Sequence, residues 1–172
     1  MGPHTTCWGY LSQVDTQFIL IFNTNYASSL EKESIALQGK YPDFLLIDAY
    51  NYLDIYEIKK PSTQLLKKDG SRGNYYWDVE IAKAISQVEN YIAYADRHGS
   101  GLREDIKKRK GIDIRVLKPR GFIIAGQRSQ LQGEIMEGNF RLLNSGLKNV
   151  EVILYDELLD NLRSFLKRLK TA

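Results

Sequence analysis

One stretch of the sequence, YPDFLLIDAYNYLDIYEIKKP at residues 41–61, limits most strongly what this chain can fold into. Residues 43–50 are almost continuously apolar, and residues 53–60 alternate between apolar and polar side chains, which is typical of two β-strands. Asn51 and Tyr52 lie between them, and asparagine tolerates the positive φ that tight turns need. The stretch therefore predicts an antiparallel hairpin.

The expected hairpin gathers charged side chains at one end. Alternate residues of its second strand share a face that is apolar at its start and charged at its end: Leu53, Ile55, Glu57 and Lys59. Antiparallel pairing places Asp43 beside the charged end. Neighbouring carboxylates favour each other's protonation, and a hard divalent cation such as Mg²⁺ relieves that conflict. With a lysine two residues from the glutamate, the parts needed for metal-assisted phosphodiester hydrolysis are present.

These residues also resemble a known pattern. Pro42-Asp43 followed by Glu57-Ile58-Lys59 is similar to the PD-(D/E)XK nuclease signature. Further blocks follow the order seen in the Shedu family of bacterial anti-phage proteins: PDFLL, YEIKKP, AISQVENYIAYAD, GFIIAGQR, FRLLNSGL and VILYDELLD. Together they span residues 41–162 and resemble the C-terminal nuclease domain of that family.

The resemblance implies an α/β fold with a PD-(D/E)XK (restriction-endonuclease-like) core, in which helices flank a mixed β-sheet. It implies a metal-dependent DNA endonuclease, with Mg²⁺ or Mn²⁺ held by Asp43, Glu57 and the backbone carbonyl of Ile58. Lys59 would position or activate water. Gln87, on the helix after the second strand, would support the metal-bound water or contact a phosphate.

The resemblance also implies a DNA partner and a homo-oligomer. Related nucleases often take a further acid from upstream of the aspartate, and Glu33 is the candidate here, with Glu31 beside it. Two solvated glutamates would explain the same residues.

The rest of the chain predicts one domain, residues 17–172, after an N-terminal tail or short helix at residues 1–16. Strands are expected at residues 17–22, 113–116, 120–125 and 149–154, and helices at residues 78–98, 131–147 and 156–170. Residues 62–77 are expected to form a mobile loop over the site, and residues 99–109 show no regular pattern. The order of elements predicts an antiparallel first half and a parallel second half of the sheet.

Two basic segments are candidate DNA contacts. The first is the expected loop, which contains Lys67, Lys68 and Arg72. The second lies within residues 103–120, where eight lysines or arginines stand against three acids; its candidates are Lys107, Lys108 and Arg109. Such segments can follow a phosphate backbone, and a solvated loop would have the same composition.

Composition excludes several other classes. The single cysteine, Cys7, permits no internal disulfide, and with two histidines it disfavours a structural zinc site. No apolar run approaches the roughly 20 residues of a membrane-spanning helix, so we expect no membrane partner and a cytoplasmic protein. The net charge of +3 alone is no signature of nucleic-acid binding.

Two alternatives keep the predicted fold. One is a catalytically silent module that binds DNA or senses DNA ends, and the other is a structural domain in which the three charged residues form surface ion pairs. Intact Asp43, Glu57 and Lys59 favour the nuclease. The last helix also has two explanations, because its apolar stripe could face the core or carry oligomer contacts: Leu158, Leu159, Leu162, Phe165, Leu166 and Leu169.

Overall fold

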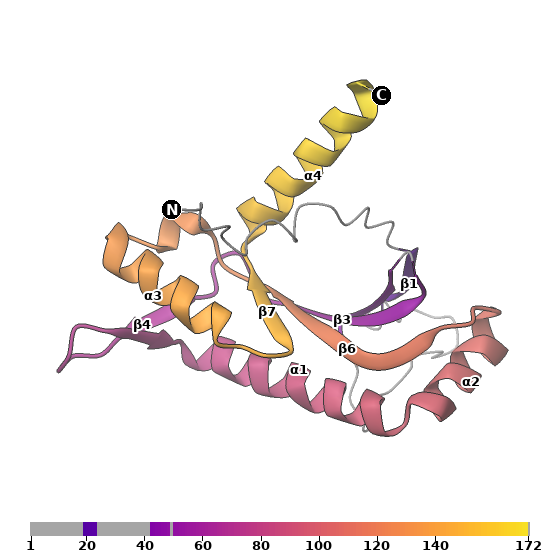
Figure 1. Ribbon diagram of the computed structural model, residues 1–172. Helices are drawn as coiled ribbons and strands as arrows, with labels where there is room; N and C mark the ends of the chain where they lie inside the picture. Colours follow the sequence, from indigo (N-terminus) through magenta and orange to yellow (C-terminus); the bar gives the residue numbers. More distant parts are fainter. Residues whose placement is uncertain (1–18, 24–41, 49, 172) are drawn as a thin grey trace, which may run out of the picture.

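The structure is a computed structural model that describes residues 19–23, 42–48 and 50–171 (Figure 1). Its strands are β1 (Ile19–Asn23), β2 (Phe44–Ile47), β3 (Tyr52–Ile58), β4 (Leu66–Lys68), β5 (Tyr75–Trp77), β6 (Arg115–Ile124) and β7 (Val150–Ile153). Its helices are α1 (Val79–Arg97), α2 (Gly99–Lys110), α3 (Gly133–Ser145) and α4 (Tyr155–Thr171), with a 3₁₀ turn at Arg128–Gln130. The expectations for residues 1–16 and for Glu33 lie outside the described residues.

The main sheet is mixed and has the strand order β1-β2-β3-β6-β7. Strands β1, β2 and β3 pair antiparallel, whereas β3, β6 and β7 pair parallel, as the sequence predicted. Helices flank this sheet, so the predicted α/β class is confirmed and the architecture is consistent with a restriction-endonuclease-like core. Because β3 and β6 run in parallel, Tyr52 pairs with Arg115 at one end and Ile58 with Ile124 at the other.

The turn between β2 and β3 fixes the register of the central hairpin. Asn51 has a φ of 68°, the left-handed conformation expected for it. The Asp48 carboxylate accepts hydrogen bonds from the backbone N–H groups of Tyr50 (2.9 Å) and Tyr52 (2.8 Å). Strand β3 begins at Tyr52, so Tyr52 is not the second turn residue that we expected.

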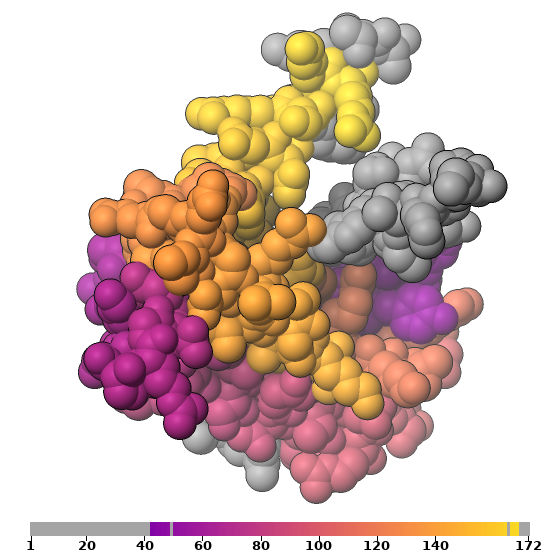
Figure 2. Space-filling view, turned by 60° about the vertical axis from the view of Figure 1, so that its left-hand side comes forward, coloured from indigo at the N-terminus to yellow at the C-terminus, as the bar shows by residue number. Residues whose placement is uncertain are grey.

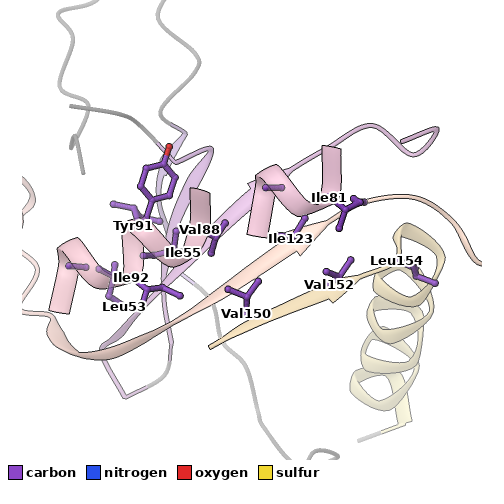
Figure 3. Close-up of a cluster of buried hydrophobic side chains, with 14 of the residues drawn as sticks. Leu53, Ile55, Ile81, Val88, Tyr91, Ile92, Ile123, Val150, Val152 and Leu154 are labelled. Atoms are coloured by element: carbon purple, nitrogen blue, oxygen red, sulfur yellow. The ribbon is translucent and has the colours of Figure 1, made fainter. Parts of the chain in front are cut away.

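The core lies between α1 and the sheet (Figure 3). The Asp78 side chain caps α1 by accepting a hydrogen bond from the Glu80 backbone N–H. The apolar stripe of α1 packs on β3, β6 and β7, as expected for an amphipathic helix. Gly121 permits this approach, since a Cβ there would lie 2.2 Å from Val88 Cγ1 and 3.0 Å from Ile92 Cδ1.

Two segments expected to be irregular are regular. Residues 62–77 contain a second hairpin, β4 paired with β5, in place of the expected loop. Its strands have three residues each, which is too short for a periodic pattern to show. Residues 99–109 belong to α2, in which only Leu102 and Ile106 are buried among charged neighbours. One i, i+4 pair is too weak a stripe to reveal a helix.

Strand β6 is one ten-residue strand where the sequence predicted two. Its register against β3 shifts between the pairs Tyr52–Arg115 and Asp54–Arg120. Lys118, with a φ of 45°, and Pro119 lie in this irregularity and interrupt the apolar alternation. The break in the pattern is therefore a bulge inside one strand.

Helix α4 does not bury its leucines as expected for a core helix. It extends away from the sheet beyond its first turn (Figures 1 and 2). Its exposed leucines are 39–52% accessible to solvent: Leu158, Leu159, Leu162 and Leu166. Helical periodicity shows which residues share a stripe, but it cannot show whether this chain supplies the surface that covers them. Neither α4 nor any other described helix is long and apolar enough to cross a membrane.

Candidate functional site

The predicted carboxylates meet where β3 ends. Asp43 directly precedes β2, and its Oδ2 accepts a hydrogen bond from the Ile58 backbone N–H at 2.7 Å. Glu57 belongs to β3, and its side chain lies on the face that packs against α1. The hairpin register thus brings Asp43 alongside Glu57 and Lys59, the arrangement that the sequence predicted.

Glu57 is a buried acid with one unsatisfied oxygen. Its Oε1 accepts a hydrogen bond from Lys59 Nζ at 2.8 Å, and the two side chains are 6% and 27% exposed. Its Oε2 is buried and has no hydrogen-bond partner among the described residues. Burial raises the pKa of the Glu57 carboxyl; Lys59 opposes that increase and the Asp43 charge adds to it. A cation at Oε2 would stabilise the ionised form.

These donors fit a magnesium or manganese ion better than a softer metal. Mg²⁺ commonly uses one or two carboxylates, keeps several waters and takes its remaining ligands from substrate phosphate. Asp43, Glu57 and the carbonyl oxygen of Ile58 would supply an all-oxygen set. Within the described part of the chain, no group of three or more His, Cys, Asp or Glu side chains could hold a metal.

Helix α1 adds a pair of polar side chains. Gln87 Nε2 donates a hydrogen bond to the hydroxyl oxygen of Tyr91 at 2.8 Å. Burial raises the pKa of Tyr91, Gln87 lowers it, and the charges of Glu57 and Asp43 raise it further. Tyr91 therefore lies close to the carboxylates. The sequence analysis missed Tyr91, although its i, i+4 spacing from Gln87 was a usable signal.

Helix α4 reaches the site through its first residue. The Tyr155 hydroxyl donates a hydrogen bond to the Lys59 backbone carbonyl at 2.7 Å. The Lys59 backbone N–H donates to the Ile124 carbonyl of β6 at 2.9 Å. Lys59 is thus held between α4 and β6. No sequence signal points to Tyr155, because the two partners are 96 residues apart.

Comparison with known proteins adds the family. The family model described as "Shedu protein SduA, C-terminal" matches residues 9–159. The chain belongs to the Shedu SduA family. A Shedu protein SduA from Bacillus cereus (strain B4264) is 31% identical over 136 residues. That alignment covers 77% of this chain and 36% of the relative, so the chain spans about a third of the relative's length.

The Shedu match includes the residues gathered at the site, from Asp43 to Tyr155. The predicted DNA contacts belong to two other elements. Lys67, Lys68 and Arg72 belong to the β4–β5 hairpin, and all three are exposed. Residues 107–109 belong to α2, which leads into the opposite end of β6.

Proposed function

We propose that this chain is the metal-dependent nuclease domain of an anti-phage defence protein and that it hydrolyses phosphodiester bonds in DNA. Shedu membership supports the defence role. The buried, unpartnered Oε2 of Glu57 supports the chemistry, because burying a carboxylate oxygen without a partner is costly unless a ligand compensates. A DNA substrate inside a bacterium would place the protein in the cytoplasm.

Each residue at the site has a distinct task in this proposal. Asp43, Glu57 and the Ile58 carbonyl would hold Mg²⁺ or Mn²⁺, which when bound supplies Lewis acidity and lowers the pKa of a water ligand. The Ile58 N–H fixes the orientation of Asp43. Lys59 places a positive charge beside Glu57, where it can orient the attacking water or offset charge on the phosphate.

Gln87 is a candidate contact for that water. Its amide nitrogen donates a hydrogen bond to the Tyr91 hydroxyl oxygen. Gln87 can therefore offer its amide oxygen as a hydrogen-bond acceptor. Tyr91 acts as a positioning residue here, because its hydrogen bond holds the Gln87 amide in place.

We also propose that the chain self-associates through α4. Besides its exposed leucines, α4 has an asymmetric charge distribution: Asp156, Glu157 and Asp160 lie in its first half, and Arg163, Lys167, Arg168 and Lys170 in its second. An antiparallel pair of α4 helices from two copies would cover both apolar stripes and set acids against bases. We therefore propose a second copy of this chain as the partner of α4.

Cleavage of plasmid and linear DNA with Mg²⁺ or Mn²⁺ tests the nuclease. We expect Glu57→Ala and Lys59→Ala each to reduce the cleavage rate by a factor of about 10² or more, because each removes a group that acts in the transition state. Lys60→Ala is the matched control, since Lys60 is the exposed neighbour of Lys59, and it should cut normally.

Two results would contradict the proposal. Cleavage that survives both substitutions would place the chemistry elsewhere. DNA binding without metal-dependent cleavage by the unmodified chain would instead favour the silent binding module.

A further inference from the structure

The β4–β5 hairpin projects from the body of the molecule on a fixed base (Figure 1). Leu66 is buried and pairs with Trp77, whose ring meets Phe140 of α3 edge to face at 5.6 Å between centroids. The Tyr75 backbone N–H donates to the Asn139 side chain at 3.2 Å. The hairpin is therefore a braced arm, and in Figure 2 it lies beside α3 on the near face.

The arm carries positive charge that its own residues do not neutralise. Lys67, Lys68 and Arg72 are exposed, and none of them forms an ion pair within the described residues. Asp69, the arm's one acid in residues 66–77, is engaged by Ser71, whose N–H and hydroxyl both donate to its Oδ1. Three positive charges against one negative leave a net charge of +2.

An aromatic side chain accompanies these cations. Tyr76 is 45% exposed and pairs across the hairpin with Lys67. Strand alternation puts Tyr76 and Lys67 on the face opposite Trp77, whereas Lys68 shares the face of Trp77. The cations of the arm suit a polyanion such as a phosphate backbone, to which the Tyr76 hydroxyl can donate a hydrogen bond.

The second basic segment, α2, differs in how many of its cations form ion pairs. Arg103 pairs with Asp113 at 2.7 Å, and Lys107 approaches the same carboxylate at 3.7 Å. Arg109 pairs with Asp105 at 2.7 Å. Three cations of this segment are therefore paired with acids, whereas the arm's cations are not paired within the part of the chain that the structure describes, although residues 103–113 keep five positive charges against three negative and so the same net charge of +2 as the arm.

Helix α2 also differs in position. It leads into the Arg115 end of β6, which pairs with Tyr52, whereas the carboxylates lie by Ile58. Ile58 is six positions along the strand from Tyr52, a distance of about 20 Å. The arm and α2 lie at opposite ends of the molecule (Figure 1).

The arm follows directly from the catalytic end of the sheet, and its linker is held there. Gln130 accepts a hydrogen bond from the Leu65 N–H at 3.2 Å and donates one to the Pro61 carbonyl at 3.0 Å. Gly126, with a φ of 58°, lies so close to Leu65 that an added Cβ would be 2.6 Å from it. The path from Lys59 to the arm is thus packed against the loop that follows β6.

We infer that the β4–β5 arm binds the phosphate backbone of duplex DNA next to the carboxylate site, and that α2 is not a DNA contact. This inference rests on the proposed nuclease function for its choice of DNA. It adds the element that holds the substrate.

Binding without cleavage tests the arm. Fluorescence anisotropy of a labelled DNA duplex, in buffer without divalent metal, would compare the unmodified chain with Lys67→Glu/Lys68→Glu. The double variant Lys107→Glu/Lys108→Glu on α2 is the matched control, because it makes the same change in net charge. Thermal melting of each variant would verify folding.

We expect the arm variant to bind at least about tenfold more weakly. The slope of log K against log salt should become shallower by about 0.9 for each phosphate that the arm no longer neutralises. The α2 variant should change both quantities little. Tyr76→Ala should weaken binding without changing the salt slope, because it removes a hydrogen-bond donor to phosphate but no charge.

Equal weakening by both double variants would overturn the inference, since it would indicate attraction by net charge alone. A larger effect from α2 would also overturn it. Arm-dependent binding by a chain that never cleaves DNA would support the arm and refute the nuclease, so the two failures are distinguishable.

Discussion

At the scale of single residues, two buried acids differ in whether their carboxylate oxygens have hydrogen-bond partners. Asp54 is 1% exposed, and both of its oxygens are satisfied by Arg120, at 3.1 and 2.7 Å. Glu57 is 4% exposed, and only one of its oxygens is satisfied, by Lys59. Because Glu57 is buried, its ion pair with Lys59 is not the surface ion pair that the structural alternative requires. Asp54 is accordingly an internal ion-pair partner of Arg120, and Glu57 is the acid that we propose binds a metal ion.

Asp54 makes the stability of the protein depend on pH. Burial raises its pKa above the ordinary value of 3.8, although Arg120 opposes the increase. A raised folded-state pKa means that the associated stability is present below 3.8 and is lost as pH rises through the raised value. Relative to Asp54→Asn, which stays neutral, the unmodified chain should therefore lose stability with rising pH. Every pKa unit between the folded and unfolded chain corresponds to about 1.4 kcal/mol.

Urea unfolding at several pH values between about 3 and about 8 would measure this difference. Asp113→Asn is the control with the opposite sign. Arg103 lowers the pKa of Asp113, so the unmodified chain should gain stability over that variant as pH rises. An Asp54→Asn difference that stays constant with pH would refute the assignment.

At the scale of elements, the site forms where the β2–β3 hairpin, α1, β6 and α4 meet. The hairpin β2–β3 supplies both carboxylates and Lys59, α1 supplies Gln87 and Tyr91, and β6 holds the Lys59 N–H. Helix α4 holds the Lys59 carbonyl through Tyr155, and its own start is fixed to the loop after β6 by the Tyr155 N–H and Gly126 carbonyl at 3.1 Å. A movement of α4 would therefore also move the Lys59 backbone, through the Tyr155 hydrogen bond.

The Tyr155 hydroxyl should matter for the rate more than for folding. We expect Tyr155→Phe to lower kcat about five- to tenfold with little change in KM, because losing one hydrogen bond of about 1 kcal/mol loosens Lys59 but leaves DNA binding intact. Single-turnover cleavage under saturating DNA would measure this.

Tyr94→Phe is a matched control, since Tyr94 stacks on His98 at the far end of α1. A Tyr155→Phe variant with unchanged kcat would show that the hydrogen bond has no role in positioning Lys59.

At the scale of the whole molecule, the two ends of the sheet have different properties. One end has the carboxylates, the braced basic arm and the root of α4. The other end has α2, whose cations pair with Asp105 and Asp113. Two chains joined by antiparallel α4 helices would bring two sites into one particle, an arrangement suited to cutting both strands of a duplex.

Self-association depends on the exposed leucine stripe in this proposal. We expect Leu162→Glu to yield monomers, because it places a charge in the middle of the apolar contact. Size-exclusion chromatography with light scattering would give the molar mass. Asn161→Glu adds the same charge at the neighbouring exposed position and should leave the oligomer intact. A monomeric unmodified chain at high concentration would contradict the proposal.

Much of the fold and of the candidate site could be predicted because the signals are local. The alternation through Glu57 predicted β3, the spacing of Ile81, Val88 and Ile92 predicted α1, and Asn51 predicted the turn that sets the register. Elements with short or weak patterns were missed. Strands β4 and β5 are too short to show a period, and α2 buries only two of its side chains.

The sequence by itself determined the elements and the chemical character of the site, since strand alternation and turn geometry place Asp43 beside Glu57 within one hairpin. Only the tertiary structure decided which groups complete that site and which surfaces remain free. Tyr155 reaches Lys59 across 96 residues, and α4 leaves its leucines exposed. The physical reason is that the spacing of apolar residues along the sequence is a local property, whereas the partner of a side chain is fixed by the packing of distant segments.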